Sequence, residues 1–375
     1  RDLKRNADTA VDSITASDVS TLPDLSVAEA LARIPGVVVQ RIALGASEGD
    51  FPSPEGGGNL IRGLTLVRSE FNSREAFSAN GGRALDFGTV PPELIGAVDV
   101  YKNNTADMIE GGIGGTINLR TLEPFDRSGR IAVFTADGTY TDLRDEWAGD
   151  FSAIIGDRWQ TDMGEFGLLG SISSSELKSD LHGFQLGMLN TVTAPNGESV
   201  AVPAGFQLRT NDVDRERESY YLAGQYRNND GTFEATAKYN RIDNETNSNE
   251  RTLEWFSDGE SFGGTTVQGL AYTPFTSAGL PQCNGSNDPT PAAPTCELTN
   301  PVTGLYESGL ISNNLRDWTG AAGANFTNLG ISQQDTSQTT DISLNLKWRP
   351  SDQWFVQLDG HKTTAELGRT RLWAG

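Results

Sequence analysis

The residues of this sequence that could do chemistry are concentrated in two polar loops near the N-terminus, at residues 43–58 and 67–84. Both loops interleave aromatic rings with guanidinium and amide groups. An aromatic ring can stack on a sugar ring, while guanidinium and amide groups donate hydrogen bonds to the hydroxyl groups around it. We therefore predict a binding site for a sugar or another polyhydroxylated ligand that comprises Asp50, Phe51, Arg68, Asn72, Arg74, Phe77, Asn80 and Arg83.

A structural role is the alternative for each of these side chains. Phe77 could pin its loop against the rest of the domain, and the arginines could pair with carboxylates of a neighbouring segment. Loops of this length are uncommon inside a small domain unless they are functional or disordered. Their length therefore favours the binding role for the set, while either role stays open for each member.

A glycine-rich segment, "ADMIEGGIGGTINLRT" at residues 106–121, is the second candidate. A phosphate-binding loop would need a helix directly after the glycines, with its N–H groups facing the anion. Here the glycines are followed by "TINLR", which alternates like a strand, and are preceded by Glu110. We therefore predict a structural role, in which missing side chains let two backbones approach closely, for Gly111, Gly112, Gly114 and Gly115.

Catalysis and metal binding have little support in the sequence. His182 and His361 are the two histidines, which are too few for a histidine-based metal cluster. No spacing of a nucleophile and a base stands out, so we predict a protein that is not an enzyme and that uses no cofactor or metal.

The two cysteines, Cys283 and Cys296, bracket the loop "NGSNDPTPAAPT". A disulfide closing this loop would stabilise the protein by about 3 kcal/mol in the chain-entropy model. Disulfides are typical of oxidising compartments. We predict the Cys283–Cys296 bond, with unpaired thiols or metal ligation as the alternatives.

The composition restricts the class of protein. A net charge of −21 argues against binding to nucleic acid, because no basic stripe is present to displace the counterions of phosphates. No apolar run approaches the roughly 18 residues of a membrane-spanning helix, and no signal peptide is visible at Arg1. Together with the cysteines, these observations favour a mature or truncated chain over a cytosolic protein.

The elements that must position the candidate residues belong to two different patterns. Residues 1–125 indicate a mixed α/β domain, with a helix at 25–36 that starts with a capping box of Ser26 and Glu29. Short strands are expected at 37–42, 59–66, 96–102 and 115–120. From about residue 130, about seven long strands alternate apolar and polar residues.

The alternation alone would suit a soluble β-sandwich with one wetted face. Three details favour an outer-membrane barrel instead: the strands are long, aromatic residues recur on their apolar face, and short turns alternate with the long connections 178–215 and 245–338. The apolar face, such as Phe233, Ala235 and Ala237, would then contact lipid, and Thr236 would face the lumen.

The plug domain of TonB-dependent outer-membrane receptors is similar to residues 8–126, segment by segment and in the same order. The segments that carry the resemblance are "LPDLSVAEALARIPGVVVQR", "NLIRGL" and "GGRALDFGTVPPELIGAVDVYKNNTADMIEGGIGGTINLRTLEPFD". The proteobacterial branch, whose plug carries "FSANGGR" and "EGGIGGTINLRT", is the most similar. In such a plug Arg62 could bridge to a lumen carboxylate such as Glu234, or it could be a solvated side chain.

The resemblance implies a plug domain at residues 1–127 and, at 128–375, the first strands of an antiparallel transmembrane barrel with long extracellular loops. A complete barrel of this kind has about 22 strands, so we expect a partial chain. It further implies active uptake of a bulky nutrient across the bacterial outer membrane. An oligosaccharide is the first expected substrate and a metal chelate the second.

The expected partners are the inner-membrane TonB complex, outer-membrane lipid, the nutrient ligand and a surface lipoprotein, without nucleic acid. A non-transporting β-rich surface binding protein or adhesin is the alternative function, and an enzyme that uses the glycine-rich turn is a more remote one.

Overall fold

A computed structural model describes residues 9–15, 26–41, 56, 58–78, 85–92, 95–106, 108–186, 189–203, 205–256, 265–274, 304–313 and 325–374. The chain forms two compact units. The first unit comprises Arg1–Asp180, Asp212–Asn249 and Ser332–Leu372, and the second comprises Leu181–Asn211, Glu250–Ile331 and Trp373–Gly375. No helix among the described residues is long and apolar enough to cross a membrane.

The N-terminal domain of the first unit is built on a five-stranded sheet, here called the N-terminal sheet, with the order β1-β6-β7-β4-β5. Its strands are β1 (Val11–Thr15), β6 (Ile95–Tyr101), β7 (Gly115–Thr121), β4 (Val67–Phe71) and β5 (Arg74–Glu75). A separate antiparallel pair joins β2 (Val37–Gln40) to β3 (Gly58–Ile61). Because β4 runs parallel to β7 while β6 runs antiparallel to it, the sheet is mixed, as predicted for a mixed α/β domain.

Helix α3 (Val27–Leu31) is the helix predicted at 25–36, although it is much shorter. The predicted capping box of Ser26 and Glu29 is wrong, because Ser26 is the N-cap but its side chain makes no cap hydrogen bond. The N–H groups of Val27 and Ala28 instead donate to two carbonyl groups of the segment 85–92, each at 3.3 Å. The N–H groups at the start of the helix are therefore satisfied by a neighbouring segment and not by side chains of the local sequence.

The predicted loop 67–84 contains a hairpin formed by β4 and β5. Its tip is Asn72 and Ser73, whose φ values are 54° and 63°. Two successive residues in this left-handed region are typical of the tight hairpin turn whose twist matches that of its strands. Asparagine adopts such a conformation more readily than most other residues. Most of the described part of this loop is thus ordered secondary structure.

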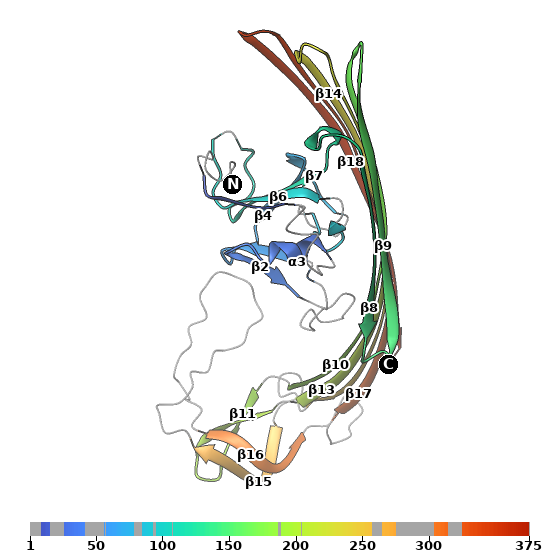
Figure 1. Cartoon of the computed structure of the whole chain (residues 1–375). Helices are drawn as coiled ribbons and strands as arrows, with labels where there is room; N and C mark the ends of the chain where they lie inside the picture. Colours follow the sequence, from blue (N-terminus) through green and yellow to red (C-terminus); the bar gives the residue numbers. More distant parts are fainter. Residues whose placement is uncertain are drawn as a thin grey trace. The chain divides into compact units, whose positions relative to one another are not determined.

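A seven-stranded antiparallel sheet, here called the long sheet, follows the N-terminal domain with the order β18-β17-β14-β13-β10-β9-β8 (Figure 1). Its first strands are β8 (Ile131–Thr141), β9 (Glu146–Thr161) and β10 (Gly164–Leu186). The others are β13 (Gly205–Arg227), β14 (Phe233–Phe256), β17 (Asn325–Ser351) and β18 (Trp354–Ala374). A mixed α/β domain followed by antiparallel barrel-type strands was predicted, and this prediction is confirmed.

The two faces of the long sheet differ as the alternation predicts. Ile342, Leu344 and Trp348 of β17 are exposed at 52%, 48% and 50%. Asp341 and Ser343, on the opposite face of the same strand, are buried. One face of the sheet is therefore apolar and open, while the polar face is covered.

The strands of the long sheet are longer than the alternation predicts. β10 continues to Leu186 and β13 already begins at Gly205, so both enter the predicted connection 178–215. β14 and β17 shorten the predicted connection 245–338 in the same way. Charged and polar residues interrupt the apolar face of these extensions, so an apolar–polar alternation did not reveal them.

The second unit contains a four-stranded sheet with the order β11-β12-β16-β15. Its strands are β11 (Leu189–Thr193), β12 (Ser199–Pro203), β15 (Thr265–Pro274) and β16 (Gly304–Asn313). A small core of Ala194, Val200 and Val202 packs against Leu270 and Tyr272. These strands lie in predicted long connections and were not expected.

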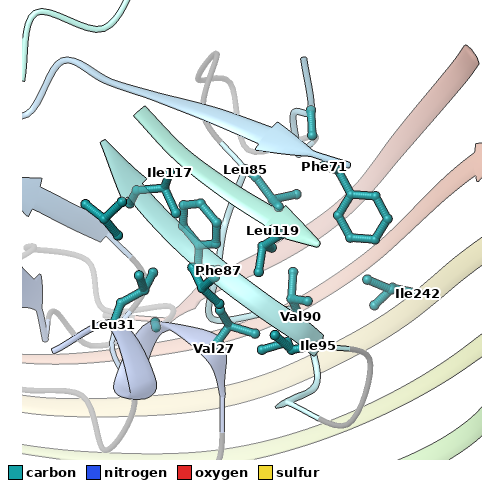
Figure 2. Packing of buried hydrophobic residues seen from close by; sticks show 14 of the residues in the cluster. Val27, Leu31, Phe71, Leu85, Phe87, Val90, Ile95, Ile117, Leu119 and Ile242 are labelled. Carbon is teal, nitrogen blue, oxygen red and sulfur yellow. The ribbon is translucent and has the colours of Figure 1, made fainter. Parts of the chain in front are cut away.

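The core of the first unit joins the N-terminal domain to the long sheet. Buried residues of the domain, among them Val27, Ile95 and Leu119, form one cluster with Ile242 and Tyr221 of the long sheet. Figure 2 shows Ile242 with the other labelled residues of this cluster. The polar face of the long sheet is thus covered by the N-terminal domain.

Candidate functional site

The glycine-rich segment crosses closely over the start of β4. A side-chain carbon at Gly112 would lie 2.4 Å from the carbonyl oxygen of Gly115 and 2.9 Å from the Cβ and the backbone nitrogen of Arg68. At Gly115, whose φ is +140°, it would lie 2.4 Å from the carbonyl oxygen of Tyr101. Only glycine fits at these two positions, because most of the nearest atoms belong to the backbone and cannot move aside.

Arg68 lies beside this crossing and is itself buried, with an exposed fraction of 7%. Its Nε donates to Glu70 at 3.0 Å, and its Nη1 donates to the carbonyl oxygen of Glu110 at 3.4 Å. The guanidinium group therefore ties β4 to the glycine-rich segment.

The tip of the β4–β5 hairpin is held by the side chain of Asn72. Its Oδ1 accepts hydrogen bonds from the backbone N–H and the hydroxyl group of Thr121, both at 3.0 Å. The same oxygen accepts a hydrogen bond from the ammonium group of Lys238 on β14, also at 3.0 Å. One amide oxygen thus joins the hairpin, the end of β7 and the long sheet.

Lys238 is the central cation of this contact. Its side chain is 7% exposed, and its ammonium group lies 2.6 Å from a carboxylate oxygen of Glu123. A buried ammonium group is costly unless it is paired and hydrogen-bonded. Glu123 and Asn72 supply these partners, so the contact depends on all three residues.

A second ion pair joins the hairpin to β18, an edge strand of the long sheet. Arg74 of β5 donates through Nε and Nη2 to the two carboxylate oxygens of Asp359 on β18, each at 2.5 Å. Asn345 donates to the same carboxylate at 2.7 Å. This two-pronged geometry is the strongest kind of arginine–carboxylate pair.

Three residues of β13 complete the contact. The hydroxyl group of Tyr221 donates to the carbonyl oxygen of Leu122 at 2.7 Å. Gln225 accepts a hydrogen bond from the backbone N–H of Phe125 at 2.7 Å. Arg217 donates to the carbonyl oxygen of Gly88 at 2.5 Å. The domain is therefore held by hydrogen bonds at several separate points.

The turn that follows β7 is the 3-10 helix η2 (Pro124–Asp126). The N–H group of Glu123 donates to the Asp126 carboxylate at 2.8 Å. Burial raises the pKa of the Asp126 carboxyl group, the hydrogen bond from Glu123 opposes this effect, and the negative charge of Glu123 adds to it. This segment leads from the N-terminal domain into β8, so its geometry sets how the chain enters the long sheet.

The predicted ligand-binding residues fall into three groups. Asp50, Phe51, Asn80 and Arg83 lie outside the described residues. Arg68, Asn72 and Arg74 bond to other parts of the protein. Phe77 is 38% exposed. The structure thus brings Asn72 and Arg74 together on one hairpin, and the binding role of the whole set stays a prediction.

Arg62 does not pair with Glu234 in this structure. Its Nη1 donates to the side-chain oxygen of Asn103 at 3.0 Å, so Arg62 bonds within the N-terminal domain. Glu234 instead pairs with Arg227 and Lys347 of the long sheet. Arg62 has a φ of 53° and is followed by Gly63 at 79°, which places the pair in a tight turn after β3.

Sequence analysis missed the partners on the long sheet. Lys238 lies two residues after Thr236, on the predicted polar face of the same strand, but its contacts with Asn72 and Glu123 were not foreseen. A search for charged residues on the predicted lumen face would have selected Lys238 and Asp359. Among the described residues, no group of three or more His, Cys, Asp or Glu side chains could hold a metal ion.

Residues 3–116 match the family model described as the TonB-dependent receptor plug domain. The chain carries a TonB-dependent receptor plug domain. For residues 3–116, the match confirms the family predicted from the sequence, which is one of bacterial outer-membrane receptors. A comparison with curated proteins gives no match.

The chain also aligns with solved structures at low identity. The alcaligin outer-membrane receptor FauA from Bordetella pertussis is 12% identical, with a TM-score of 0.36 over 99% of this chain and 57% of that chain. The ferric citrate transporter FecA is 13% identical, with a TM-score of 0.35 over 98% of this chain and 61% of that chain. The copper transporter OprC is 12% identical, with a TM-score of 0.35 over 96% of this chain and 46% of that chain. The chain therefore spans less than two thirds of the length of these proteins.

Proposed function

We propose that the complete protein imports a bulky nutrient across the outer membrane, with energy supplied through the TonB complex of the inner membrane. The observation that carries this proposal is the plug-domain match at residues 3–116. The packing of that domain on the polar face of the long sheet supports it, because a plug must close the lumen side of a barrel wall.

Transport requires the plug to change its contacts with the wall. The polar contacts that hold it are hydrogen bonds and ion pairs, such as Lys238–Glu123 and Arg74–Asp359. Water can replace these bonds once the groups separate, so each bond to a charged group adds about 1.5–3 kcal/mol of net stability. A wall contact of this kind holds the plug in the resting state and can still be opened.

The outer plug loops are our proposed floor of the nutrient site, with an oligosaccharide as the first substrate class and a metal chelate as the second. The support is the mixture of aromatic, amide and guanidinium groups in residues 43–58 and 67–84. Phe77 is available for stacking in the described structure. Arg74 would reach a ligand only after leaving Asp359.

A ligand titration on Arg74→Ala and Phe77→Ala tests this floor, with the rest of the complete protein unchanged. We expect both substitutions to weaken nutrient binding. Lys362→Ala, on an exposed part of β18, is the control. If both loop variants bind like the parent protein, the site lies elsewhere.

Uptake by a deletion strain tests the function itself. The strain is complemented with the complete gene and grown with single oligosaccharides as the carbon source, or with single metal chelates as the metal source. Growth on one substrate class should require both this protein and TonB. Surface binding of a nutrient without any effect on growth would instead identify a non-transporting surface protein. A surface lipoprotein that assists capture would be recovered with the protein after crosslinking.

We also propose the Cys283–Cys296 disulfide in a long extracellular loop. Both cysteines lie outside the described residues, so the support is their position around a proline-rich loop. Mass spectrometry of the non-reduced protein should detect the two peptides linked. Free thiols in protein purified under oxidising conditions would rule the bond out.

A further inference from the structure

The segment that leads from the plug into the long sheet carries an aromatic contact that differs from the ion pairs described above. Phe125 of η2 lies beside two guanidinium groups. The Cζ of Arg158 on β9 is 4.8 Å from the centroid of its ring, and the Cζ of Arg227 on β13 is 4.9 Å from it. Only β10 separates β9 from β13, so these two strands lie about 9–10 Å apart. The ring therefore fills the space between the two arginines.

Gly167 on β10 forms the floor of this space. A side-chain carbon at Gly167 would lie 2.5 Å from the Cβ of Pro124 and 2.9 Å from a ring carbon of Phe125. The missing side chain therefore makes the room in which Pro124 and the ring pack. We call the space formed by Arg158, Gly167 and Arg227 the Phe125 slot.

Both arginines of the slot are held in place by carboxylates of the long sheet. Arg158 donates through Nε to Glu165. Arg227 donates through Nε and Nη2 to one carboxylate oxygen of Glu234, at 3.0 Å and 2.7 Å. A guanidinium group can pair with a carboxylate along its edge while its face stacks on an aromatic ring. The long sheet itself therefore orients both side walls of the slot.

The backbone around Phe125 is bound at the same place as its ring. The N–H group of Phe125 donates to the side-chain oxygen of Gln225 at 2.7 Å. In the other direction, Nη1 of Arg158 donates to the carbonyl oxygens of Phe125 and Arg127, at 3.4 Å and 3.2 Å. Ring and backbone must therefore be released together if this segment is to leave the long sheet.

The Phe125 slot is less suited to opening than an ion pair. Water replaces the bonds of a separated ion pair, but it does not replace the apolar contacts of a phenyl ring. Withdrawal of Phe125 would also remove the aromatic face that each guanidinium group now contacts. In addition, Phe125 lies only a few residues before β8 begins at Ile131. A displacement of the other plug strands would therefore reach this contact last.

We propose that the Phe125 slot is a fixed anchor, which keeps the C-terminal end of the plug on the long sheet while the rest of the plug rearranges. Phe125, Arg158 and Arg227 are then positioning residues for transport, and the ion pairs of Lys238 and Arg74 are the contacts that open. The plug stays in the lumen during uptake, and the nutrient passes at a distance from the anchor. This role in transport rests on the proposed function, whereas the strength of the anchor does not.

Hydrogen exchange of the complete purified protein in detergent, at increasing urea concentrations, tests the anchor. We expect the peptide that contains Phe125 to stay protected at concentrations at which β2 and β3 exchange. Phe125→Leu keeps an apolar side chain but removes the aromatic face, so exchange of this peptide should become at least about tenfold faster. Phe125→Tyr keeps the ring and should behave like the parent protein.

A substitution in the floor of the slot provides an independent variant. Gly167→Ala leaves Phe125 unchanged but displaces its ring, so it should also accelerate exchange of this peptide. Gly224→Ala, on the neighbouring strand β13, is the matched control, because a side-chain carbon there meets nothing within 4 Å. Circular dichroism confirms that each variant folds.

Vancomycin sensitivity of cells that produce the complete protein tests the role in transport. The intact outer membrane excludes vancomycin because of its size, and a barrel that has lost its plug would admit it. We expect Phe125→Leu to make cells sensitive when TonB is present and to leave them resistant when TonB is deleted. Cells with the parent protein or with Phe125→Tyr should be resistant in both strains.

Four results would count against the proposal. The anchor is overturned if the Phe125 peptide of the parent protein exchanges together with β2 and β3, or if Phe125→Leu and Gly167→Ala both exchange like the parent. Sensitivity of Phe125→Leu cells without TonB would show that the ring is needed only for folding. Resistance of these cells with TonB, although the parent supports TonB-dependent growth, would overturn the role in transport. If the parent supports no such growth, the proposed function fails, while the exchange result still decides the anchor.

Discussion

Substitution of Lys238 should weaken the contact between the plug and the long sheet most directly. Its ammonium group bonds Asn72 and Glu123, and its side chain is almost fully buried. Lys238→Met keeps the apolar stem and leaves both partners without their cation. We expect a loss of about 1–3 kcal/mol in the free energy of opening this contact, measured by hydrogen exchange at the amides of β7.

Lys347→Met is the matched control for that substitution. Lys347 lies on the same sheet and pairs with Glu234 at 3.2 Å, but its side chain is 44% exposed. Pairs of this kind contribute about 0–1 kcal/mol. Equal effects of the two substitutions would show that burial of Lys238 adds nothing to the contact.

Gly112 should tolerate no side chain. Gly112→Ala would bring a carbon to 2.4 Å from a backbone oxygen, so the glycine-rich segment must shift away from β4. Overpacking of this kind costs about 1–3 kcal/mol. We expect faster hydrogen exchange in β4 and β7, while Gly149→Ala, which meets nothing within 4 Å, should leave exchange unchanged.

The residues of the contact show how far sequence alone reaches. The glycines of residues 111–115 could be assigned a structural role because the chemistry next to them excludes a phosphate loop. The bonds of Asn72 to Thr121 and Lys238 join positions far apart in the chain. Local sequence does not encode such pairs, so a side chain suited to a ligand can equally be one that bonds within the protein.

At the scale of elements, the alternation of each long strand assigns one face to lipid and the other to the interior. Leu358 of β18 is 61% exposed, and its neighbour Asp359 points to the other face, where it bonds Arg74 of the plug. Gln357, also exposed, shares the face of Asp359. The two faces can therefore be compared at adjacent positions.

Leu358→Arg should destabilise the folded protein in detergent or lipid by about 2–4 kcal/mol, because the charge must enter the apolar band. Gln357→Arg should be much milder, since its face is polar. Unfolding in urea from lipid vesicles measures both. Thr236, the lumen-facing position suggested by sequence alone, is unsuitable as a control because it is buried and bonds Gln225. Similar losses for the two arginine variants would mean that the faces are assigned incorrectly.

The elements that sequence analysis missed share a physical cause. The extension of β13 contains "DRERE" at residues 214–218, in which Arg215 and Arg217 are buried while Glu216 and Glu218 are not. The period of two persists there as an alternation of charge sign, although apolar residues are absent. The length of helix α3 was overestimated from the sequence. Its start depends on carbonyl groups of residues 85–92, and its length depends on packing, neither of which local sequence shows.

At the scale of the whole molecule, the described polar contacts between the plug and the long sheet come from the β4–β5 hairpin, from Gly88 and from the segment that follows β7. Asn72, Arg74, Gly88 and the segment 121–125 supply the polar bonds to the long sheet. The pair β2–β3, in contrast, bonds to itself. We therefore expect β4 and β7 to be held to the long sheet more firmly than β2 and β3.

Hydrogen exchange of the complete protein should reveal this difference. Amides of β4 and β7 should exchange more slowly than those of β2 and β3, because they open only when the wall contacts also open. Slow exchange throughout would instead show that the plug opens as one cooperative body. Proteolysis of the native protein, which should cut first around β2 and β3, provides an independent measurement.

The hairpin tip at Asn72 has to satisfy two separate demands with one amino acid. Its backbone is left-handed, with a φ of 54°, and its side-chain oxygen accepts three hydrogen bonds. Glycine meets the first demand and fails the second, while glutamine has the oxygen but lacks the backbone preference. Aspartate meets both and adds a negative charge facing Lys238. Geometry therefore restricts position 72 to asparagine or aspartate. A change between these two would alter the strength of the contact between the plug and the long sheet without altering the fold.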